Sequence, residues 1–312
     1  MNTARIHEWA ASRGMAVRVI PIAALEHVRL RLERLAAAGA LQADFVRGSL
    51  SGFRYLDGRS VAAPRSLVLL ALPRPAHVVG FRLGGRVREF VLPPTYCNYT
   101  PTFDLVRDWF RSDLGLGASQ ADLVSAPLKS LAATAGLIRY GKNNVGYAPG
   151  LGSFIQLIGL ATSLPLEQDG EVLPIEDRGL EACRECRACA RACLTGAIGP
   201  DRFLLRAERC FTLFSESADP IPETISPPSI DCLIGCLKCQ EVCPANKGLL
   251  KREHTGLVFD ERESEALLSG AESEDPSIRG EIRAKVSTLH TTEDVGMLAR
   301  NLRFVLRPQG LA

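Results

Sequence analysis

The stretch CRECRACARAC, residues 183–193, decides how the second half of this chain folds. It places Cys183, Cys186, Cys189 and Cys193 with two, two and three residues between successive cysteines. In proteins that hold two four-iron, four-sulfur clusters, such a run supplies three thiolates to one cluster, and its fourth cysteine ligates the other. The spacing therefore predicts two 4Fe–4S clusters.

A second group, CLKCQEVCP at residues 236–244, repeats the end of this run. It adds Cys236, Cys239 and Cys243, and a proline follows the last of them. In the first group, Leu194 stands where this proline is usual, which changes the backbone turn but not the ligands. The pair of groups predicts a domain like a bacterial ferredoxin.

The eighth ligand remains open at this point. Nine of the ten cysteines lie between Cys183 and Cys243, and two of these, Cys210 and Cys232, belong to neither group. Two clusters take eight thiolates and the two groups supply seven, so one of these two cysteines is the eighth ligand. The spacing does not choose between them.

Two other uses of cysteine fit less well. A zinc ion held by the pairs Cys183/Cys186 and Cys236/Cys239 would leave five cysteines of the region unexplained. A disulfide framework is typical of small secreted chains, not of a chain with grouped cysteines at this length. Cys97 lies far upstream and is expected to be a buried apolar residue.

Composition indicates a folded chain with a near-neutral surface. The 312 residues are 46% hydrophobic and 23% charged, with Lys+Arg 37 against Asp+Glu 35. A net charge near zero and the lack of a basic tract give no electrostatic reason for binding nucleic acid. A nucleic-acid partner is therefore expected to be unlikely.

No targeting or membrane segment is expected. Residues 1–25 mix charged side chains among the apolar ones, so no uninterrupted hydrophobic region is present. The longest apolar runs, such as residues 66–72 and 154–162, are far shorter than the ~20 residues that a membrane span needs. The sequence predicts a cytoplasmic protein with no membrane partner.

The first half alternates helix and strand patterns. Apolar spacing predicts helices, short apolar runs predict strands, and Gly84-Gly85 predicts a hairpin turn. The expected helices are 22–38, 103–114 and 127–135, and the expected strands are 66–72, 78–83 and 86–92. We expect an α/β (or α+β) cofactor-binding domain at 1–175, the ferredoxin-like domain at 176–255 and a helical tail at 256–312 that ends in a helix over 292–306.

Residues 136–154, GLIRYGKNNVGYAPGLGSF, have the composition of a binding loop. Glycine lets a backbone approach a bulky ligand, and Asn and Tyr supply hydrogen bonds and flat surfaces. The alternative is a surface loop made of ordinary turns.

The sequence resembles the epoxyqueuosine reductase family and, more distantly, the cobalamin-dependent reductive dehalogenases. The likeness runs from about Ser66 to Lys247. It is carried by SLVLLALPRP, AGLIRYGKNNV, GSFIQLIGLATSLPL, CRECRACARACLTGAI, RCFTLFSE and GCLKCQEVCPANK.

The resemblance implies a cobalamin in the α/β domain, beside two clusters that deliver electrons to the cobalt. It also implies a ligand assignment in which Cys210 is the eighth ligand and Cys232 is spare. One cluster would be held by Cys183, Cys186, Cys189 and Cys243, and the other by Cys193, Cys210, Cys236 and Cys239.

The chain departs from the family pattern near the substrate. Val124 stands where epoxyqueuosine reductases have an aspartate proton donor, and Asp122 lies two residues earlier. Arg139-Tyr140 replaces the family's tryptophan, and little sequence follows the clusters for a tRNA-binding extension. We therefore expect a small-molecule substrate other than epoxyqueuosine, with reduced ferredoxin or flavodoxin as the electron donor.

Tyr140 and Lys142 are the candidate catalytic residues. A lysine beside a tyrosine lowers the pKa of the phenol and makes it a usable acid. The alternative is that Tyr140 packs in the fold and Lys142 touches only a cofactor amide or phosphate.

The candidate cobalamin-binding residues follow in the same segment. Asn143, Asn144, Tyr147, Gly152 and Ser153 could bond the corrin amides, or they could form turns. His254 and His290 are isolated in the sequence and are expected to lie on the surface.

The leading hypothesis is an iron–sulfur, cobalamin-dependent reductase of an unidentified substrate. The first alternative is an electron-transfer protein without cobalamin. The second is an activator that reduces the corrinoid of another protein.

Overall fold

The structure is a computed structural model. It describes residues 3–41, 43, 46–55, 61–172, 179–199, 204–217, 220–223, 225, 230–270, 275–291 and 295–307. The chain divides into two compact units, the first formed by Met1–Pro73 with Thr102–Glu185 and the second by Arg74–Pro101 with Cys186–Ala312. The expected division at 1–175, 176–255 and 256–312 stays a prediction.

The first unit is built on a four-stranded sheet with the order β1-β2-β8-β5. Its strands are β1 (Ala16–Pro21), β2 (Ser66–Pro73), β8 (Ile155–Thr162) and β5 (Ala121–Leu123). Every neighbouring pair in this sheet is antiparallel. The strand expected at 66–72 is confirmed, and the antiparallel pairing favours the α+β form of the predicted fold.

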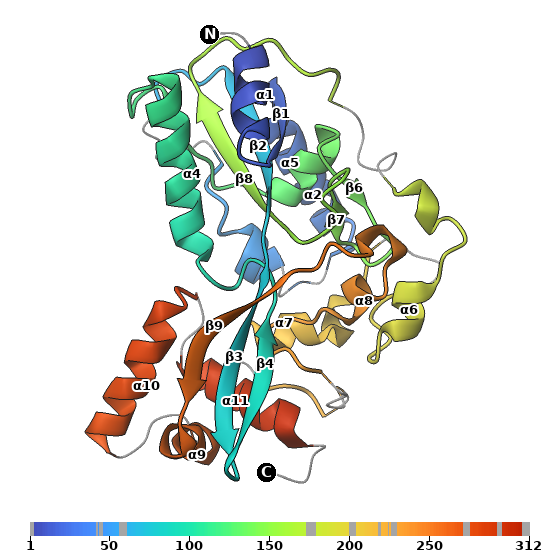
Figure 1. The fold of residues 1–312 in the computed structure, drawn as a ribbon. Coiled ribbons are helices and arrows are strands. Elements are labelled where there is room, and N and C mark those ends of the chain that lie inside the picture. Colours follow the sequence, from blue (N-terminus) through green and yellow to red (C-terminus); the bar gives the residue numbers. More distant parts are fainter. Residues whose placement is uncertain are drawn as a thin grey trace. The chain divides into compact units, whose positions relative to one another are not determined.

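Helices cover both faces of this sheet (Figure 1). Side chains of a strand alternate between the two faces, so β2 is buried on both sides. Its Leu67 and Leu69 join the core under α2 and α5, and its Val68 and Leu70 join the core under α1 and α4. This double burial explains why the strand is one continuous apolar run. The helices are α1 (Thr3–Ala11), α2 (Ala24–Ala37), α4 (Tyr99–Leu114) and α5 (Leu128–Thr134).

The second unit contains a three-stranded sheet with the order β4-β3-β9. β3 (Ala76–Leu83) and β4 (Arg86–Leu92) form the predicted antiparallel hairpin, and Gly84 and Gly85 have φ of 59° and 75° at its turn. Only glycine adopts two such consecutive values easily. β9 (Arg252–Phe259) pairs in parallel with β3 from far along the chain.

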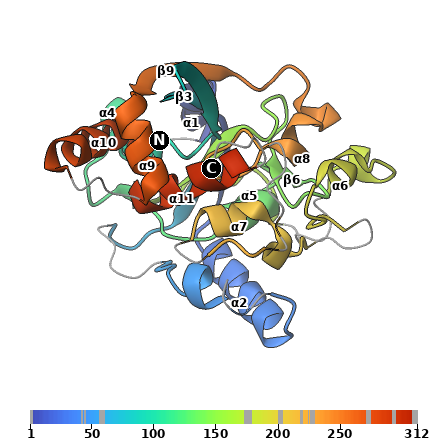
Figure 2. The same ribbon diagram turned by 90° about the horizontal axis from the view of Figure 1, so that it is seen from below.

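Three helices complete the second unit (Figure 2). They are α9 (Glu261–Ser269), α10 (Pro276–Thr288) and α11 (Val295–Leu306), and α9 packs against β3, α10 and α11. The predicted final helix is confirmed as α11, while residues 292–294 lie outside the described residues. Arg300 and Asn301 of α11 donate to the backbone carbonyls of Phe214 and Ser215, which fixes α7 (Phe211–Ser215) in this unit.

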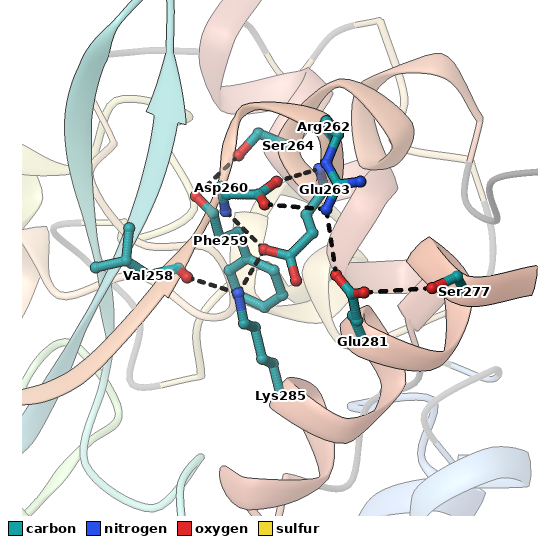
Figure 3. Close-up of polar contacts among 9 residues, drawn as sticks. All are labelled: Val258, Phe259, Asp260, Arg262, Glu263, Ser264, Ser277, Glu281 and Lys285. Atoms are coloured by element: carbon teal, nitrogen blue, oxygen red, sulfur yellow. Dashed lines mark hydrogen bonds and ion pairs between the residues drawn. The ribbon is translucent and has the colours of Figure 1, made fainter. Parts of the chain in front are cut away.

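A polar network holds the start of α9 (Figure 3). Asp260 accepts a hydrogen bond from the backbone N–H of Glu263, and Glu263 Oε2 accepts from the Asp260 N–H at 2.6 Å. This reciprocal arrangement satisfies N–H groups that a helix start leaves without partners. Lys285 of α10 donates to Glu263 and to the Val258 carbonyl, so it joins β9, α9 and α10.

Candidate functional site

The eight predicted cluster cysteines lie on short helical turns or within two residues of them. These turns are η3 (Glu181–Cys183), α6 (Ala188–Ala192), η4 (Ala207–Arg209), α7, α8 (Lys238–Glu241) and η5 (Pro244–Asn246). α6 packs against α8 within the second unit, so Cys189 of the first group and Cys239 of the second lie on adjoining helices, while Cys183 belongs to the first unit. All ten cysteines are described, and none forms a disulfide. The thiols are thus available as metal ligands.

Three predicted ligands of one cluster lie close together. Burial raises the pKa of the Cys210 thiol, and nearby Cys193 raises it further. Burial also raises the pKa of Cys236 to about 11, and Cys210 and Cys193 both add to this shift. Because one thiolate disfavours another only at short range, Cys193, Cys210 and Cys236 form one group. These are three of the four thiols that the family resemblance assigns to the second cluster.

Cys232 has a different setting. It is 1% exposed, and the backbone around it pairs with Val91, whose N–H donates to the Asp231 carbonyl at 2.7 Å. Burial raises the pKa of Cys232, with Asp231 and Cys236 adding to the effect. Cys210 and Cys193 thus raise the pKa of Cys236, and Cys236 in turn raises that of Cys232. The choice of Cys210 as the eighth ligand stays a prediction.

The donor set fits two clusters better than a single ion. Among the described residues, no three His, Cys, Asp or Glu side chains converge on a point that one metal ion could occupy. A 4Fe–4S cluster spreads its four thiolates over four iron atoms, so it requires a wider arrangement than zinc does. Cys97 is 1% exposed, which confirms that it is a buried residue.

The segment expected to be a binding loop forms a tight hairpin. β6 (Arg139–Tyr140) pairs with β7 (Gly146–Tyr147). The N–H of Gly141 donates to the Val145 carbonyl, and the Asn144 N–H donates to the Gly141 carbonyl, both at 2.9 Å. Asn144 has a φ of 59°, the left-handed conformation that asparagine tolerates in turns.

The predicted cobalamin-binding side chains bond within this hairpin. Asn143 Nδ2 donates to Tyr147 Oη at 2.9 Å, and each of these residues is 3% exposed. Gly152 exchanges two backbone hydrogen bonds with Ala148, and Ser153 is buried. These contacts are those of the turn-forming alternative. They do not form a cradle of polar side chains for a corrin, so the cobalamin-binding roles stay a prediction.

Tyr140 packs in the core of the first unit. Burial raises the pKa of its phenol, against smaller lowering effects from a hydrogen bond with Ser130 and the charge of Arg31. Lys142 Nζ donates to the Arg184 carbonyl at 2.9 Å. The expected lowering of the phenol pKa by Lys142 is therefore wrong, because burial outweighs every lowering effect on Tyr140.

Sequence reasoning missed the lysine that does adjoin this hairpin. Lys129 Nζ lies 5.7 Å from the centre of the Tyr140 ring and donates to the Asn144 carbonyl at 2.9 Å. It lies on α5, about two turns before the glycine-rich segment begins at residue 136. The short run Pro127 to Ala135 was expected as a helix, but its lysine carried no signal of this contact.

The two positions near the family's proton donor have structural roles. Val124 is 7% exposed and lies in the core, and its N–H donates to the Gly159 carbonyl at 3.0 Å. Asp122 Oδ1 lies 3.1 Å from Arg111 Nη2 and also accepts from the Leu123 N–H. The expected absence of the family's aspartate at Val124 stays a prediction.

Two further expectations concern the surface. His254 is confirmed as a surface residue, since its side chain is 67% exposed, with Nδ1 3.4 Å from Glu89 Oε1. In the part of the chain that the structure describes, every helix is too short or too polar to cross a membrane.

Comparison with known proteins places these features in a wider group. Residues 182–246 match the 4Fe-4S double cluster binding domain. An epoxyqueuosine reductase of Bacillus subtilis strain 168 is 33% identical over 223 residues, covering 64% of this chain and 54% of that protein. An epoxyqueuosine reductase of Pseudomonas aeruginosa is 30% identical over 197 residues, covering 62% of this chain and 49% of that protein. The chain therefore spans about half the length of these curated relatives.

Solved structures give the same fold. An epoxyqueuosine reductase from Bacillus subtilis, with its catalytic loop swung out of the active site, has a TM-score of 0.68 and 21% identity, covering 97% of this chain and 80% of that one. An epoxyqueuosine reductase solved with an epoxyqueuosine-modified tRNA-Tyr stem loop also has a TM-score of 0.68 and 21% identity, covering 99% of this chain and 82% of that one.

These findings confirm the family resemblance, the mixed helix and strand fold, and the double-cluster domain in place of a zinc site. They conflict with one expectation. A protein of the same fold is solved with a tRNA stem loop, so the expectation drawn from net charge, that a nucleic-acid partner is unlikely, is not supported. Charge averaged over a chain says nothing about one basic surface on it.

Proposed function

We propose that this chain is an iron–sulfur reductase in which two 4Fe–4S clusters pass single electrons to a cobalamin. The observation that carries the proposal is the reach of the sequence similarity. The match to the Bacillus subtilis epoxyqueuosine reductase covers 64% of the chain, far more than residues 182–246. A chain that had only borrowed a ferredoxin domain would match over that domain alone.

The eight thiolates would hold the clusters and set their potentials through burial. The proximity of Cys193, Cys210 and Cys236 supports the assignment of these thiols, with Cys239, to one cluster. Burial that raises a thiol pKa disfavours negative charge at that place. The same burial would disfavour the extra electron on a reduced cluster, so it would tune how readily each cluster accepts one.

Cobalamin enters the proposal through the family similarity. When bound, it would supply a reduced cobalt for reductive chemistry. The internal bonds of Asn143 and Tyr147 mean that these two side chains, as placed, would not hold it. The contacts of the hairpin 139–147 would instead keep a fixed, largely buried wall in the first unit.

The protein must also supply a proton. We assign this role to Tyr140, whose phenol is protonated at neutral pH at its ordinary pKa of about 10. Burial raises this pKa and so weakens the acid, which means that bound substrate would have to favour release of the proton. Lys142 would then hold the hairpin to the backbone at Arg184 and so position Tyr140 without acidifying it. The alternative role of Tyr140 is packing. Replacement of Tyr140 by phenylalanine separates proton donation from packing, because it removes the hydroxyl and keeps the ring.

The substrate divides into two classes. The core placement of Val124 supports a substrate whose protonation does not depend on the family's aspartate. A small molecule and a modified tRNA both remain to be tested, the second because a protein of this fold is solved with a tRNA stem loop. Binding of an epoxyqueuosine-modified stem loop, followed by analysis of the modified base, distinguishes them.

The decisive experiment is an anaerobic absorption spectrum with iron and cobalt analysis after reconstitution with iron, sulfide and cobalamin. We expect about eight iron atoms and about one cobalt per chain. About eight iron with no cobalt would favour the electron-transfer protein. Retained cobalt without turnover, together with reduction of another protein's corrinoid, would favour the activator.

A further inference from the structure

We propose that four arginines of the second unit, Arg187, Arg191, Arg206 and Arg209, form a docking ridge for an acidic one-electron donor protein of the ferredoxin or flavodoxin type. This proposal deepens the proposed function, since it rests on the two clusters and names the surface through which they are reduced. It does not depend on cobalamin or on the substrate.

The four arginines are placed together by local structure. Arg191 donates its backbone N–H to the Arg187 carbonyl across one turn of α6, so the two side chains share a face. The Arg206 N–H donates to the Ala197 carbonyl at 2.8 Å, and Arg209 Nη1 lies 3.8 Å from where a Cβ on Gly196 would stand. The segment that carries the second pair thus runs beside the loop that follows α6.

The charges of these arginines are exposed in the described part of the chain. All four residues are exposed, and within the described part of the chain no ion pair or side-chain hydrogen bond engages their guanidinium groups. Among the described residues, Glu185 lies two residues before Arg187 and Glu208 lies between the second pair, so four arginines stand against two acidic residues and the ridge is positive. Like charges one helical turn apart repel each other, so Arg187 and Arg191 do not serve the stability of α6.

The ridge lies at the clusters. Cys189 stands between Arg187 and Arg191 on α6, and Cys193 ends that helix. Leu194, next to Cys193, is 55% exposed, and Val242, next to Cys243, is 44% exposed. Apolar side chains with arginines at their edge are typical of protein–protein interfaces. A negatively charged partner would be steered to the point where a cluster is closest to the surface.

The same charges could attract RNA, but the surroundings favour a protein. Sites for single-stranded RNA add exposed aromatic side chains on which bases stack. Phe211, the aromatic residue nearest Arg209 in the sequence, is 3% exposed. The reaction at the ridge is one electron passing from the reduced donor to an oxidised cluster, which yields the oxidised donor and a singly reduced cluster.

The test is the rate of cluster reduction by reduced ferredoxin and by reduced flavodoxin, followed by stopped-flow absorption without cobalamin or substrate. At low ionic strength the R187E/R191E variant is expected to lose about tenfold or more in the second-order rate constant. The loss should shrink at high salt, because exposed charges are then screened. The neutral variant R187Q/R191Q should fall between the two.

The matched control is R82E/R86E, which reverses two exposed arginines beside the β3–β4 turn, apart from α6 in both ribbon views (Figures 1 and 2). It should change the rate by less than about twofold. Unchanged iron content and unchanged reduction by a small uncharged mediator establish that the clusters are intact. Equal losses in both pairs, or no loss in R187E/R191E, overturn the proposal.

A tRNA stem loop provides the competing outcome. If R187E/R191E weakens binding of the stem loop while donor kinetics stay unchanged, the ridge is a nucleic-acid surface and the proposal is overturned. Failure of the cobalamin hypothesis is seen separately, as missing cobalt, and leaves these rates unaffected.

Discussion

Lys285 Nζ lies 2.5 Å from Glu263 Oε2, and the Glu263 side chain is 1% exposed while that of Lys285 is 30% exposed. The pair joins α9 to α10 beside β9 (Figure 3). In the described residues, the second carboxylate oxygen of Glu263 has no hydrogen-bond partner. Lys285 is therefore the main compensation for a buried charge.

Removal of this lysine should destabilise the second unit. We expect Lys285→Met to cost about 2 kcal/mol, below the 3–5 kcal/mol of a fully buried pair because Lys285 is partly in solvent. Urea unfolding followed by circular dichroism measures the loss. Arg262→Met is the control, since its side chain is 64% exposed and its pairs are worth about 0–1 kcal/mol. Equal losses would contradict the buried-pair interpretation.

Single cysteine variants test the ligand assignment. Cys239→Ala is expected to leave about four iron atoms per chain, because one cluster loses a ligand and the other keeps its set. Cys210→Ala should behave in the same way, whereas Cys232→Ala should retain about eight. Iron analysis and electron paramagnetic resonance after reduction give the readout. If Cys210→Ala retains about eight iron atoms and Cys232→Ala loses about four, then Cys232 is the eighth ligand and Cys210 is spare.

Tyr140→Phe separates proton donation from packing. The ring stays and only the hydroxyl is removed, so folding and iron content should be unchanged. We expect turnover to fall by about a hundredfold, the lower part of the range for general acid catalysis. The measurement is the rate under saturating reductant once a substrate is found. Turnover equal to that of the native protein would leave Tyr140 a packing residue.

The hairpin 139–147 tolerates no side chain at Gly141. A Cβ there would stand 2.5 Å from Asn143 Oδ1 and 2.7 Å from Tyr147 Cε2, inside contact distance. Gly141→Ala should cost about 1–3 kcal/mol through this overpacking. Gly179→Ala is the matched control, because nothing lies within 4 Å of its added Cβ. Similar unfolding midpoints for the two variants would show that the hairpin adjusts freely.

His77 should make stability depend on pH. Burial lowers its pKa, the charge of Arg74 lowers it further, and Glu253 opposes them. Above the unfolded pKa of about 6.5, His77 is neutral in both the folded and the unfolded state and costs the fold nothing. As the pH falls below 6.5 the unfolded state binds the proton more readily than the folded state, so the free energy of unfolding decreases toward the folded pKa. His77→Gln should reduce the drop in the urea midpoint between about pH 7.5 and 5.5.

Patterns that act over a few residues could be predicted well. The alternation of sheet faces explains the apolar run of β2, and the glycine pair explains the β3–β4 turn. The start of α9 carried a usable signal that was missed, an aspartate followed by glutamate three residues later. β9 could not be found in this way, because its pairing with β3 joins segments distant in the sequence.

In the candidate site, too, contacts between residues close in the sequence could be predicted, and contacts between distant residues could not. The spacing of the cysteines predicts the cluster ligands because the ligands of each group are close together in the sequence, on one short loop. The contacts of Asn143 and Lys129 depend on how the hairpin and α5 meet in space. The composition of residues 136–154 therefore indicated a segment of interest. It did not indicate which of the polar side chains form hydrogen bonds within the hairpin itself.

The chain passes between its two units after Pro73, after Pro101 and after Glu185. A gene fusion that cut once before the cysteine groups would carry β9 away from β3, its partner strand. The exposed strand edge would then be open to association with other chains. Exchange of the second unit between related genes thus requires three crossovers that keep residues 74–101 with residues 186–312. This ties the inheritance of the hairpin to that of the cysteines from Cys186 to Cys243, while Cys183 stays with the first unit.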